Sequence, residues 1–492
     1  MPFGLPLSLP FGLRIGRRSL IGGDQNARGG NQGDRPDLSW VPEFWKSVRD
    51  YVFVREEDNV VILPPNMVYK TNETGVKILA ALDSGQKIEK LPGMDAAKLR
   101  DIAGFLSDIK DICDGRQVTT ERVAYGFDFT RLPILGEIAV TYRCNNRCLF
   151  CYAGCGSGGS CGSGQAFPSG MASEELDTRE IKRVIDIFRE KAKIPFFSFT
   201  GGEPLLRSDL GELIAYADGK HLRVNLITNG TLASPERARS LYKAGLRTAQ
   251  VSLESPDAAI HDRLCGAPGA HERTLAGIEA LAAAGIRVQT NSTLTRPNRE
   301  SLLSMPAYLK SLGVERFSMN LYIPAANSER APELFVAYSE TGAFVDEIRR
   351  QAFREGLTFF WYSPTPLCIY NPVARGLGNK SCAAADGLLS VNPAGDILPC
   401  SSYPESLGNI LKKDFSDIWF SERAAHFKNK RYAPESCASC ASFTACQAAC
   451  PLYWDYAGYG ELENARKTME TGAGGDNRAT SRPAVSAADE KR

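Results

Sequence analysis

The chain has 492 residues, enough for two or three domains, and its content of 43% hydrophobic and 23% charged residues is ordinary for a soluble globular protein. A formal net charge of +1 gives no indication of a nucleic-acid or anionic-membrane partner, and no apolar run approaches the roughly 18–20 residues of a membrane helix. The fourteen cysteines are spaced like metal ligands and not like the disulfides of small secreted chains, so we expect a cytoplasmic protein.

Both ends of the chain have compositions that do not support a core. Residues 1–37 contain apolar patches broken by proline, and their arginines follow these patches, which is the reverse of a secretory signal. Residues 463–492 are rich in Gly, Ala, Asp, Ser and Arg. We therefore expect a disordered leader at 1–37 and a disordered tail at 463–492.

A small α+β module is expected at residues 38–127. Strands are predicted at 52–54, 59–63 and 67–70, and helices at 72–82 and 95–112, with Cys113 left to the core. This order, with Pro-Asn-Met-Val-Tyr-Lys-Thr-Asn at 65–72 and Leu-Ala-Ala-Leu-Asp-Ser-Gly at 79–85, resembles the winged-helix peptide-recognition module typified by the chaperone of pyrroloquinoline-quinone synthesis. In that family a precursor peptide adds as a strand to an exposed sheet edge. The alternative is a module that only caps the next domain.

Strands and helices alternate through residues 128–330. Strands are predicted at 134–140, 195–199, 223–227, 248–253, 287–291 and 316–321. The helices between them, such as 178–192 and 270–284, each carry one apolar face or a clear stop signal. Six such units predict an α/β fold, a partial (β/α)6 barrel of the TIM type, with its chemistry at the C-terminal ends of the strands.

Three cysteines follow the first of these strands directly. Cys144, Cys148 and Cys151 lie on one loop, and clustered soft thiolates indicate a metal. A structural zinc site with Cys155 as fourth ligand is one interpretation. The other is an iron-sulfur cluster held at three corners, with one iron open to a small molecule.

The run Gly-Gly-Glu-Pro at 201–204, together with the three cysteines, resembles the radical S-adenosylmethionine enzymes. The resemblance implies a 4Fe-4S cluster on Cys144, Cys148 and Cys151, whose open iron is chelated by S-adenosyl-L-methionine. It also implies cofactor contacts at the strand ends, from Phe150 against the adenine and from Gly201, Gly202, Glu203, Pro204, Asn229, Ser252 and Glu254. For Asn229 and Ser252 the alternative is that each only caps the helix that follows.

One position departs from the family pattern. An arginine that pairs with the methionine carboxylate is often found where this chain has Cys265, so Arg263 is a candidate substitute. Cys265 itself is expected to be a small buried residue. A glycine-rich insert at 154–164 carries Cys155 and Cys161, which have either a chemical role or a place in an accessory loop.

Residues 331–462 contain regularly spaced cysteines. Gly395-x4-Cys400 and Cys437-x2-Cys440-x5-Cys446-x3-Cys450 resemble the SPASM extension of the same enzymes, which implies one or two auxiliary 4Fe-4S clusters. Two zinc knuckles are the alternative. On the family pattern, the nearer cluster takes Cys368, Cys382, Cys400 and Cys450. The farther cluster takes Cys437, Cys440 and Cys446, with an open iron or a non-cysteine ligand such as Asp455.

The resemblance implies a 5′-deoxyadenosyl radical that abstracts a substrate hydrogen, while auxiliary clusters accept an electron or bind the substrate. The N-terminal module favours a ribosomally made peptide as substrate, modified by a crosslink or a related oxidation. The rival enzyme function is tailoring of a small cofactor, such as a tetrapyrrole or a molybdenum/tungsten cofactor. A zinc-stabilised interaction protein is the non-enzymatic alternative. A low-potential donor such as flavodoxin or ferredoxin is the expected electron source.

Overall fold

The computed structural model describes residues 12–14, 35–63, 67–114, 121–123, 129–154, 175–325 and 331–470. Most of the expected leader, the part of the insert that carries Cys155 and Cys161, and the tail from residue 471 lie outside these ranges. No helix in the described ranges is long and apolar enough to cross a membrane.

The described part of the N-terminal module, which was expected at residues 38–127, contains the predicted strands and helices. It has β2 (Phe53–Arg55), β3 (Val60–Leu63), β4 (Met67–Lys70), α2 (Glu73–Asp83), a short 3-10 turn (Ile88–Lys90) and α3 (Ala96–Cys113). Asn72 and Asp95 cap the two helices, because each side chain accepts a hydrogen bond from a backbone N–H of the first turn. Helix α1 (Val41–Val48), absent from the sequence prediction, packs an apolar face on this core.

The leader contributes a strand to this module. Residues Gly12–Arg14 form β1, which pairs in parallel with β4 and antiparallel with β5 (Glu121–Val123). The sheet order is therefore β2-β3-β4-β1-β5. These three residues lie within the segment 1–37 that was expected to be a disordered leader. An unpaired edge strand offers a row of free N–H and C=O groups, and even a short segment of suitable backbone can pair with it.

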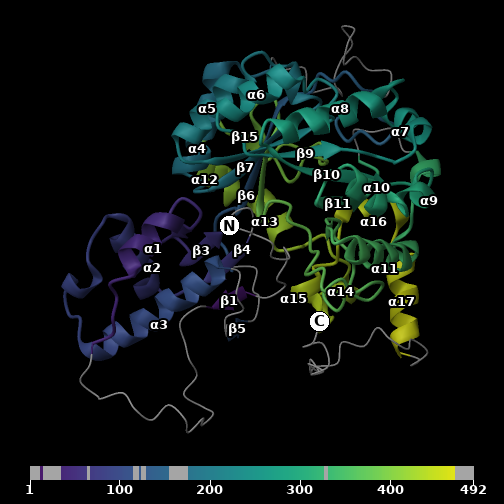
Figure 1. The fold of residues 1–492 in the computed structure, drawn as a ribbon. Helices are drawn as coiled ribbons and strands as arrows, with labels where there is room; N and C mark the ends of the chain where they lie inside the picture. The colour runs from purple at the N-terminus through teal and green to yellow at the C-terminus, as the bar shows by residue number, and fades with distance from the viewer. Residues whose placement is uncertain are drawn as a thin grey trace.

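The six predicted barrel strands form one parallel sheet. They are β6 (Leu135–Thr141), β7 (Phe196–Gly201), β8 (Arg223–Thr228), β9 (Thr248–Ser252), β10 (Arg287–Leu294) and β11 (Arg316–Leu321). The connecting helices are α4 (Thr178–Glu190), α5 (Leu210–Gly219), α6 (Pro235–Lys243), α7 (Ala258–Cys265), α8 (Ala270–Ala283), α9 (Arg299–Leu302) and α10 (Met305–Ser311). The larger helices lie around one side of this sheet (Figure 1). The predicted fold class is confirmed.

The C-terminal region extends the same sheet at both edges. Helix α11 (Tyr338–Glu355) leads to β12 (Thr358–Trp361), which pairs in parallel with β11. At the other edge, β13 (Leu388–Val391) pairs in parallel with β6 and continues into antiparallel β14 (Asp396–Leu398) and β15 (Gly408–Asn409). The expected boundary at residue 330 therefore does not coincide with the end of the sheet, because strand pairing between distant segments leaves no local signal.

Short helices follow β15 in the chain. They are α12 (Phe415–Trp419), α13 (Glu422–Lys428), α14 (Glu435–Ala438), α15 (Phe443–Cys446), α16 (Pro451–Ala457) and α17 (Gly460–Glu470). Helix α16 packs on the start of α11, where the Tyr453 hydroxyl accepts a hydrogen bond from the Tyr338 N–H at 2.8 Å. Helices α14 to α17 lie near α11, on the side away from α4 and α5 (Figure 1). Helix α17 extends into the segment that was expected to be a disordered tail.

The module is attached to the first barrel strand. Val60 and Ile62 of β3 form a small apolar cluster with Ile134, just before β6. Lys70 Nζ donates a hydrogen bond to Phe129 O at 3.0 Å. Because β6 leads directly to the cysteine loop, the module is connected through one strand to the candidate site.

Candidate functional site

Cys144, Cys148 and Cys151 lie on the loop after β6, and all three are partly buried. Burial, opposed by a hydrogen bond from the Asn146 N–H and reinforced by Cys148 and Cys151, raises the pKa of Cys144 to about 12. A hydrogen bond with Cys265, burial and the neighbouring Cys151 raise the pKa of Cys148. The thiols are therefore close enough to influence one another, and the raised pKa values favour the protonated form of Cys144 and Cys148 without metal. Metal binding would remove these protons.

The glycines at 201 and 202 allow the β7 loop to approach the cysteine loop. Gly201 has φ +136°, and a Cβ on Gly202 would lie 2.3 Å from Arg143 O. Gly202 N donates to Thr141 O at 2.8 Å, and Glu203 N donates to Arg143 O at 2.9 Å. These glycines were expected to admit a ligand. In the structure their contact is with the backbone that carries Cys144, so their first effect is to fix the position of the cysteine loop.

Glu203 is fully buried and links β7 to β8. Its carboxylate accepts hydrogen bonds from the Leu205 N–H at 2.9 Å, the Thr228 hydroxyl at 2.7 Å and the Asn229 N–H at 2.8 Å. Burial raises the pKa of Glu203, although these three donors act in the opposite direction. Pro204 starts a short buried 3-10 turn. These two residues therefore connect neighbouring strand ends within the protein.

Asn229 bridges the β8 end to the cysteine loop. Its Nδ2 donates to Asn145 Oδ1 at 2.9 Å and lies 3.9 Å from Cys144 Sγ. The helix that follows is capped by Ser234, so Asn229 has another role than capping. Nearby, the buried Asn146 side chain has no hydrogen-bond partner among the described residues. A buried amide without a partner needs an explanation, and a bound polar group at this loop would supply one.

Glu254 and Ser252 mark the end of β9. Glu254 is 2% exposed, and its Oε2 accepts a hydrogen bond from the Thr293 N–H at 2.7 Å. Burial raises the pKa of Glu254 to about 8, so the carboxyl is largely protonated at neutral pH. The next helix, α7, is capped by Asp257 and not by Ser252. The capping interpretation of Ser252 therefore does not hold.

Helix α7 brings a fourth cysteine to the first three. Cys265 is 3% exposed, packs against Cys148, and its Sγ lies 3.4 Å from His261 Nε2. Arg147 N also donates to Cys265 O at 2.9 Å. The expected burial of Cys265 is found. Arg263, the candidate substitute for the family's arginine, lies on the exposed side of the same helix.

Phe150 packs in a small apolar cluster with Leu264, Tyr322 and Leu334. This cluster lies between α7 and the segment after β11, at the same end of the barrel as the cysteine loop. The aromatic ring is therefore positioned by α7, and its predicted contact with adenine stays a prediction.

Sequence reasoning missed a polar face inside the barrel. Alternate residues of β7 to β11 pack on the helices, and most of the residues between them, except Phe196 and Ile227, are polar. Asn225 Nδ2 donates to Ser198 Oγ at 3.2 Å, and Asn291 Nδ2 donates to Asn320 Oδ1 at 2.7 Å. The signal was the apolar-polar alternation within these strands. Such a face can bind a polar substrate beside the loop cysteines.

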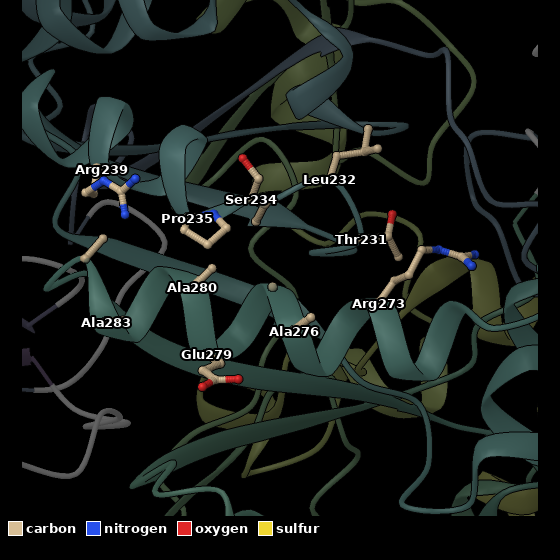
Figure 2. A pocket seen from close by; sticks show the side chains of 13 residues that line it. Thr231, Leu232, Ser234, Pro235, Arg239, Arg273, Ala276, Glu279, Ala280 and Ala283 are labelled. Atoms are coloured by element: carbon tan, nitrogen blue, oxygen red, sulfur yellow. The ribbon is translucent and has the colours of Figure 1, made fainter.

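A cavity of about 660 Å³ lies between the start of α6 and the side of α8 (Figure 2). Its lining includes Leu232, Ala276 and Arg273, and none of the described cysteines. It adjoins the site only through Thr231, whose hydroxyl accepts a hydrogen bond from Asn145 Nδ2 at 2.7 Å. We therefore assign the cofactor site to the strand ends and not to this cavity.

The C-terminal cysteines form two groups. The neighbours that affect the thiol of Cys368 are Cys446, Cys437 and Cys440. Those that affect Cys400 are Cys382 and Cys450. On the family pattern Cys368 was assigned to the second group; in the structure the segment that carries it lies beside Cys446, whose Sγ accepts a hydrogen bond from the Leu367 N–H at 3.3 Å. Asp455, suggested for the farther cluster, instead affects Cys450 of the nearer one.

The residues fit the implied cofactors. Thiolates are the usual ligands of iron-sulfur clusters, and each of the three groups supplies at least three. In the described ranges no three His, Cys, Asp or Glu side chains converge as they would around a single metal ion. Thiols bound to different corners of a cubane lie farther apart than ligands of one ion, so this finding concerns single-ion sites.

Comparison with known proteins identifies two families in the chain. Residues 138–321 match the radical SAM superfamily, and residues 382–441 match the SPASM family, described as an iron-sulfur cluster-binding domain. The AdoMet-dependent heme synthase of Methanosarcina barkeri is 31% identical over 332 residues, which cover 63% of this chain and 88% of that protein. The mycofactocin maturase MftC of Mycobacterium ulcerans is 28% identical, over 67% of this chain and 85% of that protein.

The fold is also that of solved structures. Streptococcus suis SuiB superposes with a TM-score of 0.60 at 16% identity, over 82% of this chain and 95% of SuiB. Other structures of SuiB contain S-adenosylmethionine or the precursor peptide SuiA. The two family matches give iron-sulfur clusters and S-adenosyl-L-methionine as the cofactors, which favours an enzyme over a zinc-stabilised interaction protein. The chain belongs to the radical S-adenosylmethionine superfamily and carries a SPASM iron-sulfur domain after its barrel.

Proposed function

We propose that this enzyme oxidatively modifies a ribosomally made precursor peptide, by a crosslink or a related oxidation. The observation that carries the proposal is the direct attachment of a small sheet-containing module to the strand that leads to the cysteine loop. Such a module can capture a peptide by adding it as a strand. Attachment to β6 would hold the captured peptide at a fixed distance from the barrel.

The attachment is built on a buried ion pair. Arg55 Nε and Nη2 each lie 2.8 Å from the Asp58 carboxylate. The same guanidinium donates to Pro133 O at 2.6 Å and Leu132 O at 3.1 Å, and Asp58 accepts a hydrogen bond from Arg131 N at 2.8 Å. Residues 131–133 precede β6 directly. The module is therefore held by several charge-assisted hydrogen bonds to the barrel backbone.

The edge of β4 is the proposed docking position. A peptide strand could satisfy its N–H and C=O groups, which now pair with the chain's own β1. The leader strand would then be displaced when a precursor binds. Because β1 is only three residues long, its displacement costs few hydrogen bonds.

Within the barrel, Cys144, Cys148 and Cys151 would hold the first cluster. When bound, this cluster and S-adenosylmethionine supply hydrogen-atom abstraction. Asn229 and Glu203 fix the loops around the cofactor, and the polar barrel face, including Asn225 and Asn291, orients the substrate. Glu254 holds a proton on a buried carboxyl at the β9 end. A low-potential donor such as flavodoxin or ferredoxin would supply the electron.

The test uses anaerobically reconstituted full-length protein with reductant and the small peptides encoded beside its gene. We expect one peptide to lose hydrogen, detected by mass spectrometry, only when S-adenosylmethionine is present. A matched protein with Cys144, Cys148 and Cys151 changed to alanine should leave that peptide unchanged. If no encoded peptide binds the full-length protein or changes mass while cofactor cleavage proceeds, the substrate is not such a peptide.

Tailoring of a small cofactor is the second candidate. It is favoured by the similarity to heme synthases, which extends over 88% of one of them. Saturable porphyrin or pterin binding by the full-length protein, together with no peptide binding, would select this function.

A further inference from the structure

We propose that the barrel interior binds a carboxylate group of the substrate through Arg316, assisted by Tyr362 and Gln289. The choice of a peptide as substrate rests on the proposed function. For such a peptide, the group is an acidic side chain or the C-terminal carboxylate. The site itself consists of barrel residues and does not depend on that choice.

Strand β11 directs Arg316 into the barrel. Successive side chains of a strand point to opposite faces of the sheet. Phe317 and Met319 are fully buried in the core on the helix side, so Arg316 and Ser318 share the inner face. The Ser318 hydroxyl donates a hydrogen bond to Asn291 Oδ1 of β10 at 2.9 Å, which agrees with this placement. Arg316 therefore belongs to the polar face of the barrel.

Aromatic side chains of β12 and the residue after it hold the guanidinium at this face. Ser318 of β11 pairs with Phe360 of β12. Arg316 Cζ lies 5.5 Å from the centroid of the Phe360 ring, and that ring stacks on Tyr362 with the centroids 6.1 Å apart. A cation–π contact orients a guanidinium but does not neutralise its charge. Arg316 thus keeps a full positive charge beside these two rings.

The protein supplies no counter-charge for Arg316. In the part of the chain that the structure describes, its side chain, which is partly buried, forms no ion pair and no hydrogen bond. Burial and the neighbouring Arg287 lower the pKa of Arg316, while Tyr362 and the exposed Glu315 act in the opposite direction. A partly buried guanidinium beside a second one is unfavourable unless an anion neutralises it. We infer that a bound ligand supplies this anion.

Tyr362 and Gln289 add a neutral donor next to the guanidinium. Gln289 Nε2 donates to the Tyr362 hydroxyl at 2.9 Å and to Ser318 Oγ at 3.1 Å. Among the described residues, no carboxylate or carbonyl accepts the proton of the Tyr362 hydroxyl. Tyr362 is 40% exposed, so a ligand can reach it. A guanidinium and a phenol that both donate suit the two oxygen atoms of a carboxylate.

The strand register relates this group to the predicted cofactor contacts. Ser318 pairs with Asn291 of β10, and Asn291 pairs with Ser252 at the end of β9, which the family resemblance places at the cofactor. Neighbouring strands lie about 4.8 Å apart, so β11 is roughly 10 Å from β9. A carboxylate held by Arg316 should therefore lie within a few residues of the position at which the peptide is modified.

The first experiment uses anaerobically reconstituted full-length protein and measures the rate at which phenylglyoxal modifies each arginine, by mass spectrometry of the digested protein. N-acetylglutamate α-amide should slow the modification of Arg316 in a saturable manner, and the neutral N-acetylglutamine α-amide should not. Arg247, whose guanidinium lies 4.4 Å from the centroid of the Tyr242 ring of α6, is the control and should react at one rate with either probe. Equal rates at Arg316 with the two probes would overturn the inference.

The second experiment uses the precursor peptide that the enzyme modifies. Each Asp or Glu of the peptide is changed to Asn or Gln, and the C-terminus is amidated, one change at a time. One of these changes should raise the KM about 10- to 100-fold, which corresponds to the loss of one hydrogen-bonded charge pair. The change that does so distinguishes a side chain from the C-terminal carboxylate.

The same change in the peptide should have no further effect on Arg316→Gln, because the charge pair is already lost. Arg316→Lys, which keeps the charge but not the planar pair of donors, should recover part of the affinity. Arg247→Gln is the matched control and should distinguish the peptides as the unchanged protein does.

The inference is overturned if every neutral peptide reacts like the original. It is also overturned if Arg316→Gln weakens the binding of S-adenosylmethionine as much as that of the peptide, since the arginine would then serve the cofactor. If no encoded peptide is modified while N-acetylglutamate α-amide protects Arg316, the proposed function fails and the carboxylate site stands.

Discussion

Replacing Asp58 by alanine should loosen the N-terminal module from the barrel. The Arg55 and Asp58 side chains are 0% and 1% exposed, so the substitution would leave a guanidinium buried without its counter-charge. Breaking a buried pair in this way costs about 3–5 kcal/mol. The loss should be local, because the hydrogen bonds concerned join β2 and β3 to residues 131–133.

Hydrogen exchange of the full-length protein is the suitable assay, since a chain with several domains does not unfold in one step. Amides of β3 should exchange about 100- to 4,000-fold faster in Asp58→Ala, which corresponds to that loss at about 1.4 kcal/mol per factor of ten. The control is Glu73→Ala, which removes a surface pair with Lys77 whose side chains are 75% and 69% exposed. That change should leave the exchange of the β3 amides unaltered, because an ion pair exposed to water contributes little to stability.

Equal exchange rates in the two variants would refute the role of the buried pair. The same Asp58→Ala protein also tests the connection between docking and activity. It should retain cleavage of S-adenosylmethionine while losing peptide modification, because the barrel site lies on other elements. Loss of both activities together would indicate that the substitution disturbs the barrel itself.

Three further predictions concern the loop, a histidine and the leader. Gly202→Ala should displace the cysteine loop and reduce the iron content by about four atoms per chain. The control Gly211→Ala should leave the iron content unchanged, because a Cβ at position 211 has no neighbouring atom within 4 Å. Equal iron contents in the two variants would contradict the prediction. Burial lowers the pKa of His261 from 6.5 to about 4, so below pH 6.5 the unfolded chain binds a proton that the folded protein does not. The free energy of unfolding should therefore be highest above pH 6.5 and should fall by up to about 3 kcal/mol as the pH drops toward 4. Hydrogen exchange of the α7 amides, corrected for the intrinsic effect of pH, should show a flatter pH dependence of local stability for His261→Asn, and an unchanged profile would exclude this origin. Deleting residues 1–34, which include β1, should tighten binding of a precursor peptide measured by fluorescence anisotropy; weaker binding would show that β1 does not compete.

The strands of the barrel could be predicted because their signals are local. Apolar runs bounded by glycine or proline located β6 to β11 to within a few residues, and β11 was predicted with its observed bounds. The pairing of β13 with β6 could not be predicted, since it joins segments about 250 residues apart and depends on register alone. The strand at Gly12–Arg14 was missed for a related reason, because its partner supplies the hydrogen bonds that define it.

In the candidate site, too, local features could be predicted from the sequence and contacts between distant segments could not. The spacing of Cys144, Cys148 and Cys151 identified them as one group, since residues on one short loop cannot separate far. The role of Gly202 could be recognised only in the structure, because a glycine in the sequence indicates that some group lies close to the backbone but does not identify that group.

The amino-acid sequence by itself determined the chemistry of this protein: the thiolates, the alternating strands and helices, and the family to which they belong. The tertiary structure alone decided which distant thiols meet, as the grouping of Cys368 with Cys446 demonstrates. The type of ligand depends on single residues and their local spacing. Whether two distant cysteines come together depends on the path of the chain between those cysteines. In this protein that path includes a left-handed turn before α16 and a sheet that the C-terminal region extends at both edges.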